Sequence, residues 1–406
     1  YEGNKWQIKQ AAEAMTKAKK PVLYVGGGVI FAGASQELIE LAELTHMPVD
    51  MTLMGLGAFP GEHLQSMGML GMHGTYWANM VMHYSDLVVA IGARFDDRVT
   101  GKVSEFCPHA KVIHIDIDPT SIRKNVNVDI PIVGDCKLVL RELIQILRAT
   151  VNGDQRELRK PWWNQIREWQ QANPLAYQQE ADGPIKPQHV IQRLYELTKD
   201  RDPIVSTDVG QHQMWAAQYF KLAKPNRWLT SGGLGTMGFG FPAAMGAQAA
   251  FPGRLVLCIA GDGSIQMNMQ EMATAVVHKL PVKIIILNNR FHGMVRQWQD
   301  LFYEGRYASS YLETTPDFVK LAEAYGAVGL RASKPSEIVD VLKEAIAVNK
   351  PVIVDVPTYP YENVYPMIPA GGCNHEMILE DPPALKNKQS GVGQGASKDS
   401  DTILTA

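Results

Sequence analysis

The chain has 406 residues, of which 46% are hydrophobic and 20% charged, and its formal net charge is −3. This is the composition of a globular protein long enough for two or three domains. The weak negative charge gives no basic footprint for nucleic acid or an anionic membrane surface. No apolar run approaches the roughly 18–20 residues that span a bilayer. From the charge we expect no nucleic-acid partner, and from the charge and the apolar runs we expect no membrane partner.

Four cysteines, Cys107, Cys136, Cys258 and Cys373, are scattered along the chain without Cys-x-x-Cys spacing. Their spacing argues against a zinc site or a disulfide framework and favours a reducing compartment. The first residues, YEGNKWQIKQ, lack the features of a signal peptide and open into a helical pattern. We therefore expect a piece of a longer protein. Its expected location is the cytoplasm of a bacterium, with an organelle as the alternative.

In chain order, residues 1–150 alternate between helix and strand patterns. Apolar strands that alternate with amphipathic helices predict a parallel, doubly wound sheet covered on both faces. This block is therefore expected to form one α/β domain. Helices are predicted at 5–19, 35–45, 76–84 and 137–148, and strands at 21–25, 48–53, 86–91, 111–116 and 130–133.

Residues 151–185 break this rhythm with a polar segment that contains Trp162, Trp163 and Trp169. We interpret it as a linker with a helix that packs its tryptophans against a neighbouring domain. A second alternating block, 186–365, predicts a second domain with strands at 203–207, 254–260, 282–287 and 351–356. Residues 366–406 are expected to be a partly disordered tail, with NKQSGVGQGASKDSDT as its disordered part.

Residues 261–264 read Gly-Asp-Gly-Ser directly after one predicted strand, and Asn288 and Asn289 directly follow the next. A helical pattern at 268–279 joins them into a βαβ unit of about 30 residues, so Asp262 and the asparagines are expected at one edge of a parallel sheet. Carboxylate and amide oxygens suit Mg²⁺, and the glycines leave room for an anion on backbone amides. The residues alone therefore predict Mg²⁺ with a diphosphate; the alternative is an acidic turn and an unrelated asparagine pair.

This unit resembles the metal–diphosphate motif of thiamine-diphosphate enzymes, and its surroundings resemble the catalytic subunits of one family, the acetohydroxyacid (acetolactate) synthases. The resemblance extends along residues 1–370 without a gap. It implies two doubly wound parallel-sheet domains, a central FAD-associated domain at 1–150 and a thiamine-diphosphate and magnesium domain at 186–365. The segments that carry it are SGGLGTMGFGFPAAMGAQ, NNRFHGMVRQWQDLFYEGRY, LGMHGTYWANM, IGARFDDRVTG and HIDIDPTSIRKNVNVDIPIVGD.

The resemblance implies the cofactor contacts of the second domain. Asp262 and Asn289 would ligate Mg²⁺ together with the backbone carbonyl of Phe291. Met237 would support the bend of thiamine diphosphate, and the Gly235 carbonyl would accept a hydrogen bond from its pyrimidine amine. The alternative for Met237 is packing in the core. The other implied contacts are Gln211, His212, Gly263, Ser264, His292, Gly293 and Met294.

In the first block the resemblance implies bound FAD that takes no net part in the reaction. Taken alone, the glycines at 26–28 are a weak signal, because they lack the Gly-x-Gly-x-x-Gly spacing and doubly wound domains place glycines at many such turns. Asp116 at a strand end could bond a ribose or cap the next helix. The implied FAD contacts are Met72, His73, Gly74, Arg94, Asp116 and Asp135.

The implied reaction begins when the thiazolium carbanion attacks the keto carbon of pyruvate and CO₂ leaves. The enamine then condenses with a second 2-keto acid, pyruvate or 2-ketobutyrate, in branched-chain amino-acid biosynthesis. Arg98 would hold the carboxylate of that acid, and Trp298 would favour the larger acceptor. The alternatives are an ion pair of Arg98 with Asp96 or Asp97, and core packing for Trp298.

In this family the glutamate that activates the cofactor lies in an amino-terminal pyrimidine domain, which these residues do not resemble. We therefore expect the isolated chain to be inactive. The resemblance further implies a homodimer or tetramer, with a small regulatory subunit as a candidate partner. Competing functions are another thiamine-dependent decarboxylase or carboligase, such as a pyruvate oxidase, and a non-catalytic cofactor-binding fragment. A flavin oxidoreductase is disfavoured, because no redox-active cysteine pair is visible.

Overall fold

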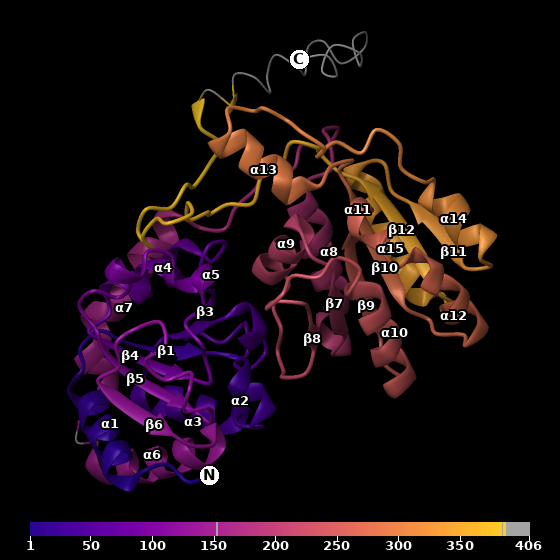
Figure 1. Ribbon diagram of the computed structural model, residues 1–406. Helices are drawn as coiled ribbons and strands as arrows, with labels where there is room; N and C mark the ends of the chain where they lie inside the picture. The colour runs from indigo at the N-terminus through magenta and orange to yellow at the C-terminus, as the bar shows by residue number, and fades with distance from the viewer. Residues whose placement is uncertain (152, 384, 387–406) are drawn as a thin grey trace.

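The computed structural model describes residues 1–151, 153–383 and 385–386. It contains two six-stranded sheets, one in each lobe of the molecule (Figure 1). The strand orders are β3-β2-β1-β4-β5-β6 and β11-β12-β10-β9-β7-β8, and every strand pair is parallel. The predicted class of two doubly wound α/β domains is confirmed. Within the described residues, no helix has the length and apolar character needed to cross a membrane.

The first sheet follows the predicted pattern closely, because its central strands are short apolar runs buried on both faces. The edge strand β3 was not predicted, since its sequence SMGM is short and contains Gly68. The strands are β1 (Pro21–Val25), β2 (Val49–Met51), β3 (Ser66–Met69), β4 (Leu87–Ile91), β5 (Lys111–Asp116) and β6 (Ile130–Val133). The helices are α1 (Lys5–Lys17), α2 (Gly27–Phe31), α3 (Ser35–Thr45), α4 (Tyr76–Tyr84), α5 (Asp97–Thr100) and α6 (Cys136–Thr150).

The predicted linker contains an 18-residue helix, α7 (Gln155–Ala172). Its Trp162 and Trp163 are buried in a core cluster with Val22 of β1. The indole of Trp162 donates to the Pro21 carbonyl at 3.2 Å, and that of Trp163 donates to the His46 carbonyl at 3.0 Å. The expected tryptophan packing therefore exists, and α7 covers the first sheet rather than spanning free space between the lobes.

The second sheet has four predicted strands and two short edge strands, β8 and β11, that were not predicted. The predicted helix at 268–279 is broken into short pieces. The strands are β7 (Ile204–Thr207), β8 (Trp228–Leu229), β9 (Val256–Gly261), β10 (Lys283–Asn288), β11 (Val328–Arg331) and β12 (Val352–Pro357). The helices are α8 (Pro187–Thr198), α9 (Gln211–Tyr219), α10 (Gly240–Ala250), α11 (Asp262–Ile265), α12 (Met272–Val277), α13 (Gly293–Phe302), α14 (Phe318–Ala324) and α15 (Ile338–Ala347).

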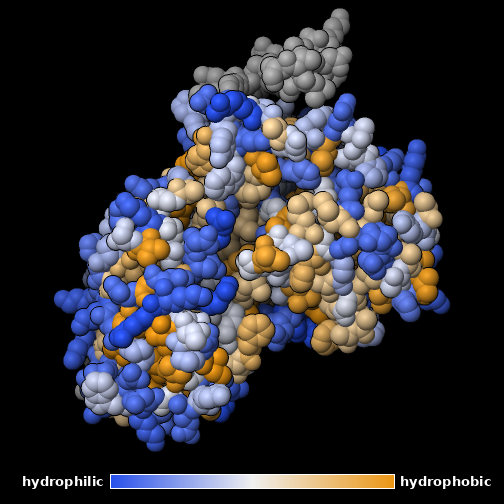
Figure 2. Space-filling view, viewed as in Figure 1, coloured by the Kyte–Doolittle hydropathy of each residue, from blue (hydrophilic) through white to orange (hydrophobic). Residues whose placement is uncertain are grey.

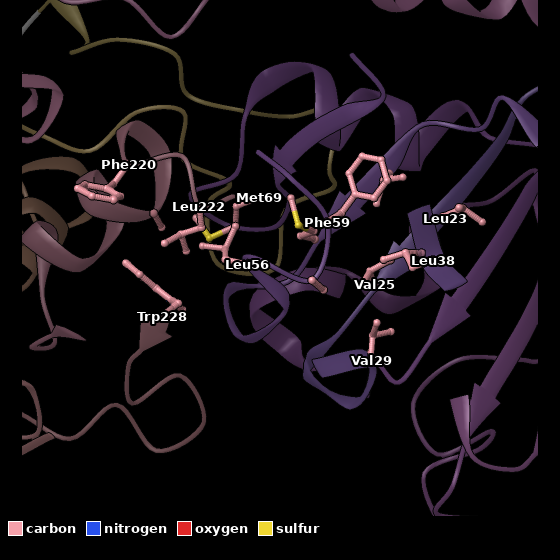
Figure 3. Close-up of a cluster of buried hydrophobic side chains, with 14 of the residues drawn as sticks. Leu23, Val25, Val29, Leu38, Leu56, Phe59, Met69, Phe220, Leu222 and Trp228 are labelled. Carbon is pink, nitrogen blue, oxygen red and sulfur yellow. The ribbon is translucent and has the colours of Figure 1, made fainter. Parts of the chain in front are cut away.

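A hydrophobic contact joins the two lobes. Leu222, in the segment after α9, lies beside Leu56 and Met69 of the first lobe, and all three are buried (Figure 3). The Leu222 carbonyl also accepts the Gly61 amide at 2.8 Å. Each large apolar side chain buried in this way contributes about 1.5–3 kcal/mol. The contact therefore fixes how the carboxyl edges of the two sheets face each other.

Residues 361–383, here called the strap, return from the second lobe to the first (Figure 1). The Ile368 amide donates to the Met72 carbonyl at 2.8 Å, and the Lys102 amide donates to the Gly372 carbonyl at 3.0 Å. Much of the expected tail is therefore packed against the first lobe. The segment NKQSGVGQGASKDSDT lies outside the described residues.

Candidate functional site

A cleft of about 920 Å³ lies between the two lobes, where the surface in Figure 2 is hollowed. Both sheets contribute the loops at their carboxyl edges, which is where open α/β sheets bind ligands. Most of the residues implied by the family resemblance line this cleft. They are Met72, His73, Arg94, Arg98, Asp116, Gln211, His212, Gly235, Met237, Asp262, Gly263, Ser264, Asn289, Phe291, His292, Gly293, Met294 and Trp298.

The βαβ unit places its polar residues as predicted. Strands β9 and β10 are parallel neighbours, and Leu287 pairs with Gly261, so the residues that follow both strands meet at one edge. The short helix α11 begins at Asp262 itself, and Gly263 closely approaches the opposite loop. A Cβ on Gly263 would lie 2.9 Å from the His292 ring, so only glycine fits there without a shift.

Asp262 is a desolvated carboxylate at the floor of the cleft. Its residue is 1% exposed, and its Oδ2 has no hydrogen-bond partner. Burial raises the pKa of Asp262 to about 7, although the backbone amides of Asp262, Gly263 and Arg290 oppose the shift. A buried carboxylate with a free oxygen is stabilised by a cation, so the site fits a divalent metal ion.

The two asparagines face different partners. Asn289 donates to Gln211 Oε1 at 3.2 Å, and its Oδ1 accepts the Phe291 amide at 3.0 Å. Asn288 donates instead to Asp355 Oδ1 at 3.0 Å. Asn289, and not Asn288, is therefore the asparagine that could share a metal ion with Asp262. Its Oδ1 retains a second lone pair for that metal. Within the described residues, no group of three or more His, Cys, Asp or Glu is arranged for a metal.

Two further residues shape the space next to Asp262. His212 is buried, its Nε2 has no partner, and burial lowers its pKa to about 3, so the ring is neutral. The hydroxyl of Ser264 accepts the Gly261 amide at 3.1 Å and therefore holds the turn. A Cβ on Gly261 would lie 2.8 Å from His212 Nδ1, which explains a glycine at this position.

The loop that carries Met237 is anchored by a residue that the sequence analysis missed. Asp208, buried at the end of β7, accepts the Gly238 amide at 2.7 Å and the Val209 amide at 3.0 Å. Asn268 donates to the Gly238 carbonyl from the other side at 2.6 Å. Met237 is half-buried and lines the cleft rather than the core. The signal for Asp208 was present, because it follows its strand as Asp262 follows β9.

At the carboxyl edge of the first sheet, glycines allow two loops that follow neighbouring strands to pack closely against each other. A Cβ on Gly26 would lie 2.1 Å from the Gly92 carbonyl oxygen, and one on Gly28 would lie 2.6 Å from the Gly92 Cα. Asp116 lines the cleft and accepts the Asp118 amide at 2.9 Å, so it forms a local turn instead of capping a helix.

Two implied FAD contacts do not line this cleft. Asp135 is the N-cap of α6, where its carboxylate accepts the Leu138 amide at 3.1 Å. Gly74 packs inside the first lobe, where a Cβ would lie 2.5 Å from the Leu70 backbone. The sequence signal for Asp135 was present, because an aspartate directly before an amphipathic run is typical of an N-cap.

Arg98 and Trp298 approach the cleft from opposite lobes. The Arg98 side chain is 65% exposed, and its nearest carboxylate, Asp97, is 3.9 Å away, which is a weak surface pair. Trp298 is half-buried on α13, with its ring 5.3 Å from that of Phe302. Neither side chain is consumed by a strong structural contact.

Comparison with known proteins agrees with this geometry. Residues 8–143 match the central domain of thiamine pyrophosphate enzymes, and residues 208–356 match their C-terminal TPP binding domain. The chain belongs to the thiamine pyrophosphate enzymes.

Within that family the chain is similar to acetolactate synthases. It is 52% identical over 380 residues to the acetolactate synthase isozyme 3 large subunit of Escherichia coli, covering 93% of this chain and 66% of that protein. It is 51% identical over 381 residues to the acetolactate synthase large subunit of Haemophilus influenzae (94% and 66%). It is 50% identical over 376 residues to the acetolactate synthase of Mycobacterium bovis (91% and 60%). The chain thus spans about two thirds of the length of its relatives or less.

Proposed function

We propose that the chain is the FAD- and thiamine-diphosphate-binding part of an acetolactate synthase large subunit. The reaction would join the two-carbon unit left by decarboxylation of pyruvate to a second pyruvate or to 2-ketobutyrate. The observation that carries the proposal is the partnerless oxygen of buried Asp262 beside Asn289, in a cleft that both lobes line. The similarity to acetolactate synthases supports the choice of reaction.

Mg²⁺ is the proposed metal. Asp262 would provide a carboxylate oxygen, Asn289 its Oδ1 and Phe291 its carbonyl, and Mg²⁺ prefers such hard oxygen ligands together with phosphate. Neutral His212 adds no charge beside the diphosphate, and Gly261 and Gly263 leave room for it. When bound, thiamine diphosphate supplies the electron sink for decarboxylation.

Residues of both lobes would orient the cofactor and its substrates. Asp208 holds the loop through Gly238, so that Met237 is presented to the cleft as an apolar support. Arg98 would bind the carboxylate of the acceptor acid, because its guanidinium is exposed and only weakly paired. Trp298 would form an apolar wall for the side chain of the larger acceptor.

FAD is proposed for the part of the cleft lined by the first lobe. Gly26, Gly28 and Gly92 bring two backbone loops together there, and such close backbone approach suits a dinucleotide. Arg94, whose side chain is 66% exposed, would donate to a phosphate or ring oxygen, and Asp116 would accept a hydrogen bond from a hydroxyl. By the names of its relatives, the whole protein would assemble with a small subunit.

Two measurements test the proposal. In calorimetric titration, thiamine diphosphate should bind the 406-residue chain with Mg²⁺ and not with EDTA. A chimera in which this chain replaces the matched part of the Escherichia coli large subunit should make acetolactate from pyruvate, whereas the chain alone should not. A chimera that decarboxylates pyruvate but forms no acetolactate would support another thiamine-dependent decarboxylase. Binding that is indifferent to EDTA would refute the metal site.

A further inference from the structure

Three side-chain amides form a continuous row from the strap to the proposed metal ligand. They belong to Gln297 on α13, Gln211 at the start of α9, and Asn289 after β10. All three are buried, with Gln297 0%, Gln211 2% and Asn289 8% exposed. Because each amide has an oxygen end and a nitrogen end, the direction of the row acts together with the Phe291 amide on which end of Asn289 faces a cation.

The Asn289 end of the row depends on Gln211. Asn289 Nδ2 donates to Gln211 Oε1 at 3.2 Å, which leaves Asn289 Oδ1 on the side of the Phe291 amide. If the Gln211 amide were reversed, its NH₂ group would face the Asn289 NH₂ group. The two NH₂ groups would repel each other and oppose the orientation that the Phe291 amide favours, and a turned Asn289 would present its nitrogen in place of the oxygen ligand.

The orientation of Gln211 depends in turn on Gln297 and the strap. Gln211 Nε2 donates to Gln297 Oε1 at 2.9 Å and to the Glu362 carbonyl at 3.0 Å. Both acceptors lie at the same end of the Gln211 amide. Gln297 and the Glu362 carbonyl of the strap therefore together hold the nitrogen end of the Gln211 amide.

The backbone of the strap fixes the orientation of Gln297. The Val364 amide donates to Gln297 Oε1 at 2.9 Å, and Gln297 Nε2 donates to the Val364 carbonyl at 3.1 Å. The thioether of Met367 accepts from the same nitrogen at 3.2 Å. A backbone amide and carbonyl cannot exchange roles, so the Gln297 amide has one allowed orientation.

We propose that Gln297 is a positioning residue, through which the strap backbone at Val364 orients the amide of Asn289 so that its oxygen faces the metal. The inference rests on the proposed magnesium site. It predicts that docking of the strap and Mg²⁺ affinity are linked, although Gln297 itself does not contact the metal. Outer hydrogen-bond partners of metal ligands typically change metal affinity by about 10–100-fold.

The test compares Gln297→Met with Gln299→Met. Methionine keeps the length and volume of glutamine but removes the acceptor for Gln211. Gln299 lies on the same helix and donates to the Ala308 carbonyl at 3.0 Å, outside the row. Mg²⁺ is titrated calorimetrically into each chain in the presence of a fixed excess of thiamine diphosphate, and the unfolding midpoint is measured in EDTA. We expect Mg²⁺ affinity to fall about tenfold or more in Gln297→Met and to stay within about twofold in Gln299→Met.

Gln297→Glu is the rescue variant, because its carboxylate still accepts from Gln211 and from the Val364 amide. Its Mg²⁺ affinity should lie closer to that of the unaltered chain than to that of Gln297→Met. If Gln297→Met does not fold, Gln297→Asn, which is too short to reach both partners, should show the same loss. Unchanged Mg²⁺ affinity in a folded Gln297 variant, or an equal loss in Gln299→Met, would overturn the inference. Absence of Mg²⁺-dependent binding in the unaltered chain would instead refute the proposed function and the inference with it.

Discussion

Asp50 in the first lobe and Asp262 in the second are both buried aspartates with a partnerless oxygen, and the two differ in their surroundings. Asp262 after β9 is 1% exposed and Asp50 in β2 is 0% exposed. Burial is the main cause that raises the pKa of both carboxyls. Asp262 receives three backbone amides and lines the cleft, whereas burial alone acts on Asp50, which lies between Tyr24 and Gly68 in the sheet. A raised pKa therefore marks a binding site only where a ligand can reach the group.

The sharpest test of this contrast is Asp262→Ala against Asp50→Asn. We expect Asp262→Ala to weaken Mg²⁺-dependent binding of thiamine diphosphate by more than ~100-fold, because it removes a proposed direct ligand of the metal and not an outer partner. Asp50→Asn should leave that binding unchanged. Calorimetric titration of the cofactor at fixed Mg²⁺ measures both. Equal losses in the two variants would mean that Asp262, like Asp50, acts only on the fold.

The pH dependence of Mg²⁺ binding is a second test that distinguishes Asp262 from Asp50. Since the pKa of Asp262 in the metal-free chain is about 7, Mg²⁺ must displace a proton below that pH. The affinity should fall about tenfold per pH unit below 7 and level off above it. Titrations in buffers of different ionisation enthalpy would also detect the released proton. The Asp50→Asn chain should give the same profile, and a flat profile in the unaltered chain would contradict the assignment.

Asp50 is expected to show its effect in stability. Its folded pKa is raised, so its favourable contribution is complete below the unfolded value of 3.8 and is lost as pH rises toward the folded value. We therefore expect Asp50→Asn to raise the free energy of unfolding by about 2 kcal/mol at pH 7, and by less at pH 4. Urea unfolding at both pH values measures the difference. A destabilised variant would indicate a hidden partner for Asp50.

The sequence predicted much of the fold because hydrophobic runs and their breaks are local signals. The bounds of β1, β5 and β6 agree with the prediction at both ends. The edge strands β3, β8 and β11 were missed, because they are two to four residues long and are defined by pairing with distant strands.

In the candidate site too, residues with a local sequence signal were predictable, and residues defined by distant contacts were not. Asp262 and Asn289 were predictable, since each directly follows a strand and the two strands are neighbours. Gln297 was not, because its partner Val364 is 67 residues away and offers only backbone groups. Asp135 was assigned from resemblance alone, and its place in the fold is that of a helix cap.

The smallest expected effect concerns Asp262 itself in the absence of metal. With a pKa raised from 3.8 to about 7, Asp262 costs the empty chain stability as pH rises through that range. Asp262→Asn removes the charge but weakens three amide hydrogen bonds, so we expect a gain of about 1 kcal/mol or less at pH 7.5 in EDTA. With Mg²⁺ and thiamine diphosphate the order should reverse, because only the unaltered chain gains binding energy. Melting curves under both conditions measure this reversal. If the variant is the more stable chain under both conditions, Asp262 is, like Asp50, a buried carboxyl that binds no metal. The contrast between the two aspartates would then not hold.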